Sequence, residues 1–533
     1  MPPSKTAPLS LTAFLLLAAL ALVAGAFYRL PALEERPMHT DEAILGYKFA
    51  QFQTTGHFQY DPKDYHGPAL HYVTRAWSRV AMWGGPETWT EAQLRTVTAV
   101  CGLLLLVVTL LLTDALGRGG VIGAMLLLAV SPMEVFYSRY FIMEILLVLL
   151  VTLSLAGFWR YSQGGARWWL VLAGAAIGMQ HATKETFILN AVAALAAWGV
   201  ARLVVGGFEP RRGGFSMGPA KKRAGMPWLW VAVPAVFVSV WFFSGGFHDW
   251  EAVKNSALTY LSYLERSGGS GHEKPWHYYL TLLVWRRNEG ILWTEAFIMA
   301  LALVGMAHAW MGNHTKNQPR QAFLVFLSTY SLLLLGGYSI LSYKTPWSIL
   351  SAQHALVLLA GYGTSVIAGA TRRGLLRTSF RIAFGLGLYH LCFQTNLAIH
   401  AYCADTRNPY VYSHTVQAFP RVLHQVAELQ SLTPEQPLSI LVVNKDAGWP
   451  LLWYWRMNRN AQYALDVPEA EISAAVILVD QEQLPAMQQR LAGKNYHDNG
   501  FYGLRPNNSL VMLVEPSLWE RFSAAKKEAA VTP

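Results

Sequence analysis

The sequence predicts a mainly α-helical, polytopic membrane protein, with a helical bundle of about eleven spans and a C-terminal extracytoplasmic α/β domain. Of the 533 residues, 53% are hydrophobic and only 14% are charged, whereas soluble domains carry roughly a quarter charged residues. Apolar runs of about 20 residues, the length that crosses a hydrocarbon core, recur up to residue 400. Beyond that point the apolar runs shorten to strand length, which indicates a second fold.

The first span has two interpretations. Lys5, an apolar run and Ala24-Gly25-Ala26 resemble a cleaved signal peptide. The apolar run from Leu9 to Phe27 is longer than a typical signal core, which favours a retained span. The predicted spans lie near 9–28, 93–113, 120–136, 141–159, 168–182, 186–205, 227–245, 291–311, 321–342, 347–370 and 380–398.

Basic residues fall in alternate connections between the spans, as they do in cytoplasmic loops. We therefore expect a multi-pass protein of the cell (inner) membrane with a cytoplasmic N-terminus and an extracytoplasmic C-terminus. This placement accounts for the net charge of +10 without a nucleic-acid partner. The residues concerned are Arg118, Arg160, Arg167, Arg211, Arg212, Lys221, Lys222, Arg223, Lys316, Arg320, Arg372, Arg373 and Arg377.

The predicted outer loop, residues 29–92, contains two helical patterns. Residues 41–53 have an apolar side and end at Gly56, and residues 68–83 begin with Pro68 in the first turn. Both patterns are typical of helices that lie in the membrane interface.

The C-terminal region reads as a small α/β domain. Residues 439–443, 475–479 and 509–514 are short buried-strand patterns, and 415–430 and 482–492 are helical. We therefore divide the chain into a membrane domain, 1–400, and an extracytoplasmic domain, 401–533. The second domain has no glycine-rich phosphate loop.

Two adjacent carboxylates, Asp41 and Glu42, stand just after the first span and are the first candidates for a site. Acids in a first helical turn also oppose the helix dipole, so helix capping is the alternative interpretation. Other polar residues in the same outer loop favour a substrate-binding site, in which a carboxylate could accept a proton from an attacking hydroxyl. They are His39, Tyr60, Asp61 and His66.

Three cations on the predicted outer face run against the general charge pattern. Arg139 and Lys184 have the acids Glu144 and Glu185 nearby, and Lys344 stands in a Tyr-Lys-Thr-Pro-Trp segment. One such residue would be a cation reaching from a helix end to the interface. Three on one face indicate a shared anionic ligand, and a phosphate at the membrane boundary fits.

A divalent metal is an open alternative for the outer loop. His66 and His71 are five residues apart, with Asp61 and Asp64 nearby, and histidine and carboxylate are ordinary metal ligands. The spacing matches no metal signature, so surface or capping roles are favoured and no cofactor is assigned.

These segments, taken in order, resemble the GT-C superfamily of integral-membrane glycosyltransferases. Within it the chain is similar to protein O-mannosyltransferases and to the lipid A aminoarabinose transferase, and most similar to prokaryotic proteins named as flippase-activity-associated. The resemblance covers roughly residues 9–400. The segments that carry it are Asp41-Glu42, Tyr60-Asp61-Pro62, His66-Gly67-Pro68, Ser138-Arg139-Tyr140 with Glu144, Thr183-Lys184-Glu185-Thr186 and Tyr343-Lys344-Thr345-Pro346-Trp347.

The resemblance implies a transferase that uses a polyprenyl-phosphate-linked sugar on the outer face. Asp41 would be the general base of an inverting displacement, with Glu42 supporting it. Arg139, Lys184 and Lys344 would hold the donor phosphate, and Glu144 would bind acceptor, donor or metal. The expected partners are the lipid-linked sugar, a glycan, lipid or protein acceptor, and membrane lipids.

Two other classes of protein compete with the transferase. A transporter or accessory subunit for lipid-linked sugars would also carry charges at the membrane edge, but the sequence lacks the paired broken helices expected of one. A sensor or scaffold with an outer binding domain would leave the outer-loop carboxylates unexplained.

Overall fold

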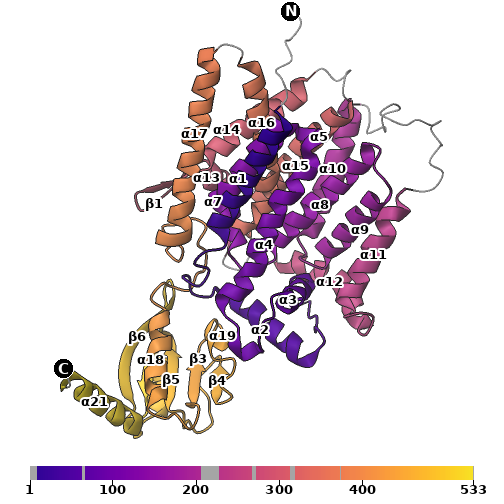
Figure 1. Ribbon diagram of the computed structural model, residues 1–533. Helices are drawn as coiled ribbons and strands as arrows, with labels where there is room; N and C mark the ends of the chain where they lie inside the picture. Colours follow the sequence, from indigo (N-terminus) through magenta and orange to yellow (C-terminus); the bar gives the residue numbers. More distant parts are fainter. Residues whose placement is uncertain are drawn as a thin grey trace, which may run out of the picture.

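The computed structural model describes residues 9–62, 66–205, 227–266, 272–312, 318–371 and 374–531, without the side chains of 261–266, 318 and 529–531. Figure 1 shows a bundle of helices with a smaller domain of strands and helices at one end. This division agrees with the predicted fold class.

Every predicted span overlaps a helix or, for residues 120–136, a bent pair of helices, although the span predicted near 291–311 begins with a short strand, Ile291–Trp293. The long apolar runs thus predicted the helical segments well. These helices are α1 (Leu11–Arg29), α4 (Glu91–Thr109), α6 (Arg118–Val130), α7 (Pro132–Ser138), α8 (Glu144–Ser162), α9 (Trp168–His181), α10 (Phe187–Val205), α11 (Leu229–Phe243), α14 (Ala296–Met311), α15 (Gln318–Ile340), α16 (Leu350–Ala370) and α17 (Gly374–Asn396).

The predicted number of spans is not confirmed. Seven helices of the described chain are long and apolar enough to cross a membrane, or eight if α6 and α7 form one span. Helices α9, α11 and α14 have 14, 15 and 16 residues, fewer than the roughly 17–25 of a membrane-spanning helix. Pro132, which disfavours the helical conformation at Ser131, begins α7 at a bend of 61° from α6.

The outer loop forms the two predicted helices, α2 (Thr40–Thr55) and α3 (Ala69–Val80), followed by the short helix η1 (Pro86–Thr88). Gly56 ends α2 in the left-handed conformation, with φ of 77°, which costs glycine little. Figure 1 shows both helices at the end of the bundle that also carries the C-terminal domain.

The amphipathic helix α12 and several short elements complete the membrane domain. They are η2 (Leu110–Leu112), α5 (Thr113–Leu116), α12 (Trp250–Arg266), α13 (Tyr278–Val284), the hairpin of β1 (Arg286–Asn288) and β2 (Ile291–Trp293), η3 (Pro346–Ile349) and η4 (Leu397–Ala401).

The C-terminal domain is a mixed five-stranded sheet in the order β4-β3-β5-β7-β6. The three predicted strands are confirmed as β3 (Ile440–Val443), β5 (Val476–Asp480) and β7 (Asn508–Val514); β3 and β5 are buried along their whole length. The strands β4 (Ala461–Ala464) and β6 (His497–Arg505) were not predicted, since they are only partly buried and lack an apolar run. The helices are α18 (Pro420–Ser431), α19 (Leu451–Tyr454), η5 (Gln481–Gln483), α20 (Leu484–Arg490) and α21 (Pro516–Val531).

Among the described residues, the basic side chains near the start of α1 and the end of α8 lie at the opposite end of the bundle from the outer loop. The predicted cytoplasmic residues Arg211, Arg212, Lys221, Lys222, Arg223, Lys316, Arg372 and Arg373 lie outside the described residues. Arg118 donates a hydrogen bond to the Leu9 carbonyl at the start of α1, and Arg160 pairs with Asp114. In Figure 1 the start of α1 lies at this end, away from α2 and the C-terminal domain. The orientation of the protein in the membrane stays a prediction.

Residues beyond 401 do not enter the C-terminal core at once. Tyr410 and Val411 belong to the hydrophobic core of the membrane domain, and the C-terminal core begins at Phe419. The segment between the last long helix and α18 is therefore packed against the membrane domain.

Candidate active site

Helix α2 begins with a reciprocal cap that involves one of the two candidate carboxylates. His39 is the N-cap residue, and its Nδ1 accepts a hydrogen bond of 3.1 Å from the backbone N–H of Asp41. Glu42 accepts one of 3.0 Å from the backbone N–H of His39. This capping box satisfies backbone donors that the first helical turn leaves without partners.

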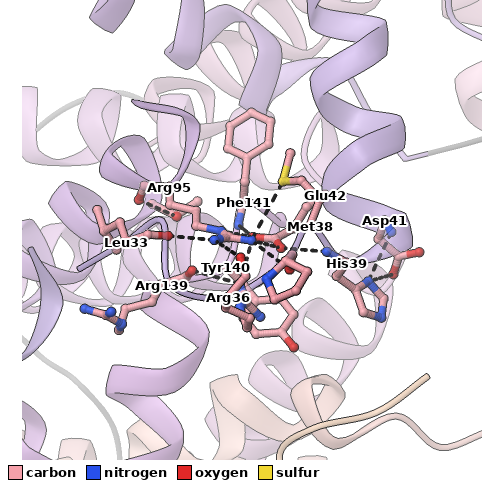
Figure 2. A network of polar contacts seen from close by, with 12 residues as sticks. Leu33, Arg36, Met38, His39, Asp41, Glu42, Arg95, Arg139, Tyr140 and Phe141 are labelled. Carbon is pink, nitrogen blue, oxygen red and sulfur yellow. Dashed lines mark hydrogen bonds and ion pairs between the residues drawn. The ribbon is translucent and has the colours of Figure 1, made fainter. Parts of the chain in front are cut away.

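Glu42 is the centre of a buried network, which Figure 2 shows. Its Oε1 is 2.9 Å from both Arg36 Nη2 and Arg95 Nε, and its Oε2 is 2.8 Å from Arg95 Nη2. The backbone N–H of Phe141 donates to Oε1 at 2.9 Å. The glutamate side chain is 0% exposed. Through these bonds it connects the start of α2 to α4 and to the turn after α7.

Electrostatics keep Glu42 ionised. Burial by itself raises the pKa of the Glu42 carboxyl, but Arg36 and Arg95 outweigh it and hold the pKa well below its usual range. The carboxylate accepts hydrogen bonds and faces two guanidinium groups, so it does not serve as a proton acceptor in this arrangement. The helix-capping interpretation therefore describes Glu42 well.

Asp41 is placed differently, although it is the adjacent residue. Its side chain is 36% exposed, and Nδ1 of the His39 ring lies 3.9 Å from its Oδ2. In the described chain, no group donates a hydrogen bond to its carboxylate within 3.5 Å. Figure 2 shows the side chain at the edge of the Glu42 network. Asp41 is thus the accessible carboxylate of the pair.

An aromatic cluster adjoins Asp41. The ring of Trp347 lies 5.8 Å from those of His39 and Tyr412. The hydroxyl of Tyr412 is 2.5 Å from His272 Nδ1. Burial and Lys274 lower the pKa of His272, while the charge of Asp41 opposes this effect. Tyr412 connects the two residues, since its carbonyl oxygen is 3.0 Å from Nε2 of His39, the cap of the Asp41 turn.

Lys344 belongs to the same region. Its backbone N–H donates to the carbonyl of His272 at 3.1 Å, and its ammonium donates to the carbonyls of Lys274, at 3.1 Å, and Leu341. Its side chain is buried, and within the described residues it forms no ion pair with an acid. Of the three predicted phosphate ligands, it is the one linked to Asp41 through His272.

Arg139 has a different set of partners. Its guanidinium donates to the carbonyls of Pro31 and Ala32 at 2.7 and 2.8 Å, and at longer range to those of Tyr28 and Arg29. Burial lowers its pKa to about 10, and the neighbouring Arg36 and Arg95 act in the same direction. These contacts fix the chain where it leaves α1.

The other predicted site residues form a second cluster around the ends of α8 and α9. Lys184 pairs with Glu144 at the start of α8. His66 Nδ1 lies 2.5 Å from Glu185 Oε2. Burial raises the pKa of Glu185, but His66 outweighs this and lowers it to about 2.

Tyr60 and Asp61 lie beside this cluster. Tyr60 is buried against Phe243, with ring centroids 4.8 Å apart, and burial raises its pKa to about 12. Asp61 is exposed. Two motifs far apart in the sequence also meet here, since the Ala69 N–H donates to the carbonyl of Ala182 at 2.9 Å.

The metal alternative finds no ligand set in the described chain. His66 pairs with Glu185, whereas His71 is buried with its ring 4.7 Å from that of Phe58. The described residues contain no group of three histidine, cysteine or acidic side chains that could hold a metal ion. Asp64 lies outside the described residues.

Four residues of the site were not singled out from the sequence: Arg36, Arg95, His272 and Tyr412. Arg95 carried a usable signal, since it is a cation at the predicted outer end of a span, where basic residues are uncommon. Arg36 lies six residues before Glu42 in the same loop, whereas His272 and Tyr412 come from distant segments and reach the site through long-range packing. The turn Arg139–Glu144 connects the Glu42 network to the Lys184 cluster.

Comparisons with known proteins give a partial family match and a likeness of fold. Residues 73–213 match the family model described as dolichyl-phosphate-mannose-protein mannosyltransferase. No curated protein sequence matches the chain. The overall structure has the GT-C fold of integral-membrane glycosyltransferases.

Two solved structures illustrate the likeness. ArnT from Cupriavidus metallidurans, solved with undecaprenyl phosphate, has a TM-score of 0.61 at 16% identity, over 96% of this chain and 99% of its own. AglB from Archaeoglobus fulgidus, solved with an inhibitory peptide and a dolichol-phosphate, has a TM-score of 0.56 at 11% identity. This match covers 95% of this chain and 76% of the AglB chain. At these identities the likeness is one of fold. The predicted likeness to flippase-activity-associated proteins has no counterpart here and stays a prediction.

Proposed function

We propose that this protein is a membrane glycosyltransferase that moves a sugar from a polyprenyl-phosphate donor to an acceptor hydroxyl on the outer face of the membrane. The observation that carries this proposal is the contrast between Asp41 and Glu42 within one helical turn. Glu42 is locked by two arginines, and Asp41 remains accessible at the helix start. The matching family model and the fold support the same class of reaction.

The proposed reaction is a single displacement with inversion. Asp41 takes the proton from the acceptor hydroxyl as its oxygen attacks the anomeric carbon. The new glycosidic bond forms while the bond from that carbon to the phosphate oxygen breaks. The bonding electrons leave with the polyprenyl phosphate, and the proton stays on Asp41 until solvent removes it. No general acid is needed, because the leaving phosphate is stabilised by fixed cations.

Lys344 is our first choice as the ligand of the donor phosphate. It is buried, its partners are neutral carbonyls, and it adjoins the His272 segment near Asp41. A phosphate oxygen could replace one carbonyl as acceptor and gain a charge-assisted bond. Arg139 and Lys184 stay in the proposal as supporting cations, although both already have partners in the protein.

The second cluster is our candidate for the remaining substrate contacts. Its members are Tyr60, Asp61, His66, Glu144 and Glu185, and they come from the outer loop and the ends of α8 and α9. We further propose that the protein lies in the cell (inner) membrane with its C-terminal domain outside. Its acceptor is a glycan, lipid or protein, and any divalent metal would have to recruit ligands beyond those described.

The test is a transfer assay with purified protein and a polyprenyl-phosphate sugar. Asp41→Asn keeps the shape but removes the proton acceptor, so turnover should fall by about 10²–10⁴-fold, the usual worth of a general base. Donor binding should change little. Glu34→Gln, an exposed acid of the same loop, is the matched control and should retain activity.

If the Asp41→Asn variant transfers sugar at the wild-type rate, Asp41 has no part in the mechanism. If the wild-type protein transfers no sugar from any lipid donor, while its loss still impairs movement of a lipid-linked sugar, the accessory role replaces the transferase.

A further inference from the structure

The chain that leaves the membrane domain returns to the start of α2. We call residues Asn408–Thr415 the interdomain linker. Asn408, Tyr410, His414 and Thr415 in this linker are almost completely buried, although the linker contains no regular secondary structure. Such burial of irregular chain requires that its polar groups find partners.

The linker makes two hydrogen bonds to the residues just before Asp41. His39 Nε2 lies 3.0 Å from the carbonyl oxygen of Tyr412, and Thr415 Oγ1 donates to the carbonyl of Met38 at 2.6 Å. The two bonds lie on consecutive residues of the α2 entry, so they fix its position from one side.

Further contacts anchor the linker to the membrane domain. The Tyr137 hydroxyl donates to the Tyr410 carbonyl at 2.8 Å, and the Tyr140 hydroxyl is 3.0 Å from His414 Nδ1. The Tyr410 hydroxyl donates to Glu295 at 3.1 Å. The linker is therefore a fixed part of the membrane domain.

The partners of His39 determine the tautomer of its ring. A carbonyl oxygen only accepts hydrogen bonds, so Nε2 must carry a proton to bond with Tyr412. A backbone N–H only donates, so Nδ1 must be bare to accept from Asp41. His39 is therefore the neutral Nε2–H tautomer, and one ring connects the linker to the backbone of Asp41.

A histidine, His39, occupies the N-cap position of α2. Ser, Thr, Asp and Asn are the preferred N-caps, and their short side chains reach only the helix that they cap. Histidine is not among them, but its two ring nitrogens point in different directions. One nitrogen caps α2 while the other holds the linker, which a usual capping residue cannot do.

We propose that His39 and the interdomain linker position Asp41, so that the proton-accepting geometry depends on the chain that leads into the C-terminal domain. The inference rests on the proposed function of Asp41. His39 is a positioning residue in it, since its side chain is only 2% exposed and both ring nitrogens are engaged.

The C-terminal domain reinforces the arrangement. The backbone N–H of Met38 donates to the Tyr454 hydroxyl at 3.0 Å, and a Cβ on Gly46 would lie 2.9 Å from the Trp453 ring. This domain therefore contacts both the approach to α2 and its second turn. A movement of the domain would reach Asp41 through the linker and through α2.

Two variants test the proposal. His39→Asn keeps a good N-cap but is too short to hold the linker. Thr415→Val removes the other linker bond with little change in shape. Thr54→Val is the matched control, because the Thr54 hydroxyl bonds only within α2.

The first measurement is hydrogen exchange of the backbone amides at the start of α2, which requires no transferase activity. We expect exchange there to rise in both linker variants and to stay unchanged in the control. The second is steady-state kinetics. The turnover number should fall about 10–100-fold, the scale expected for a misplaced catalytic group, while donor affinity stays within about threefold.

The outcomes separate this inference from the proposed function. Unchanged exchange in both variants, or a ring proton found on His39 Nδ1 by nitrogen-15 NMR, overturns the positioning role. If exchange rises in the linker variants but the wild-type protein itself transfers no sugar, the proposed function is overturned while the coupling of the linker to α2 is supported. Lower thermal stability with an unchanged turnover number per folded protein would reduce His39 to a structural cap.

Discussion

Asp41 and Glu42 are adjacent in the chain, but their carboxylates have opposite environments. The side chain of Asp41 is 36% exposed, and that of Glu42 is 0% exposed between two arginines. A helix rotates each residue by about 100° from the last, so neighbours in the first turn face different surroundings. At the residue scale this rotation separates an accessible acid from a structural one.

Glu42→Gln tests the structural role. Removing one partner of a buried ion pair leaves uncompensated charge, so we expect a loss of about 3–5 kcal/mol in stability. Unfolding in detergent, with Glu34→Gln as control, measures it. The pKa of Glu42 is depressed in the folded protein. Its contribution is therefore complete above its unfolded pKa of roughly 4.3 and falls only at lower pH. Equal stability of variant and wild type at pH 7 would contradict the role.

Lys344→Gln tests the proposed phosphate ligand. A hydrogen bond to a charged group contributes about 1.5–3 kcal/mol, so the dissociation constant for the lipid-phosphate donor should rise roughly 10–100-fold. Binding of a labelled polyprenyl phosphate to the purified protein measures this. Lys254→Gln changes an exposed lysine paired with Glu251 and should bind as the wild type does. If both variants bind equally well, the phosphate lies elsewhere.

At the scale of elements, the outer loop is built by close contact between segments distant in sequence. A Cβ on Gly67 would lie 2.2 Å from the backbone oxygen of Ala182. Glycine is thus required where the start of α3 meets the end of α9, and this contact brings His66 to Glu185. The His66-Gly67-Pro68 and Thr183-Lys184-Glu185-Thr186 motifs are therefore adjacent because Gly67 packs closely against Ala182.

Gly67→Ala should separate these two segments. Since the obstacle is backbone, it cannot move aside easily, and we expect a loss of about 1–3 kcal/mol, as in an overpacked core. Thermal unfolding and hydrogen exchange near His66 and Glu185 would measure the effect. Gly199→Ala is the control, because nothing lies within 4 Å of its new Cβ. Unchanged exchange at both segments would show that the contact is not needed.

At the scale of the whole molecule, the outer loop and the C-terminal domain lie at one end of the bundle, and the described basic residues Arg118 and Arg160 lie at the other. We expect the end with the basic connections to be cytoplasmic. A reporter that is active only outside the cytoplasm should therefore work when fused after residue 533. The same reporter in the loop after α8, near Gly164, should be inactive. The reverse pattern would invert the proposed orientation and place Asp41 in the cytoplasm.

The sequence by itself determined the helical segments, the three strands with continuous apolar runs and the carboxylate pair, because each depends on local patterns of polarity and chain length. It did not determine how many helices cross the membrane, since that depends on where each folded helix begins and ends and on whether the bent pair α6 and α7 counts as one span. Tertiary structure alone decided that Arg95, 53 residues after Glu42, encloses the Glu42 carboxylate. It also placed Tyr412, 373 residues after His39, against its ring. Such contacts join residues far apart in the chain, and no local pattern records them.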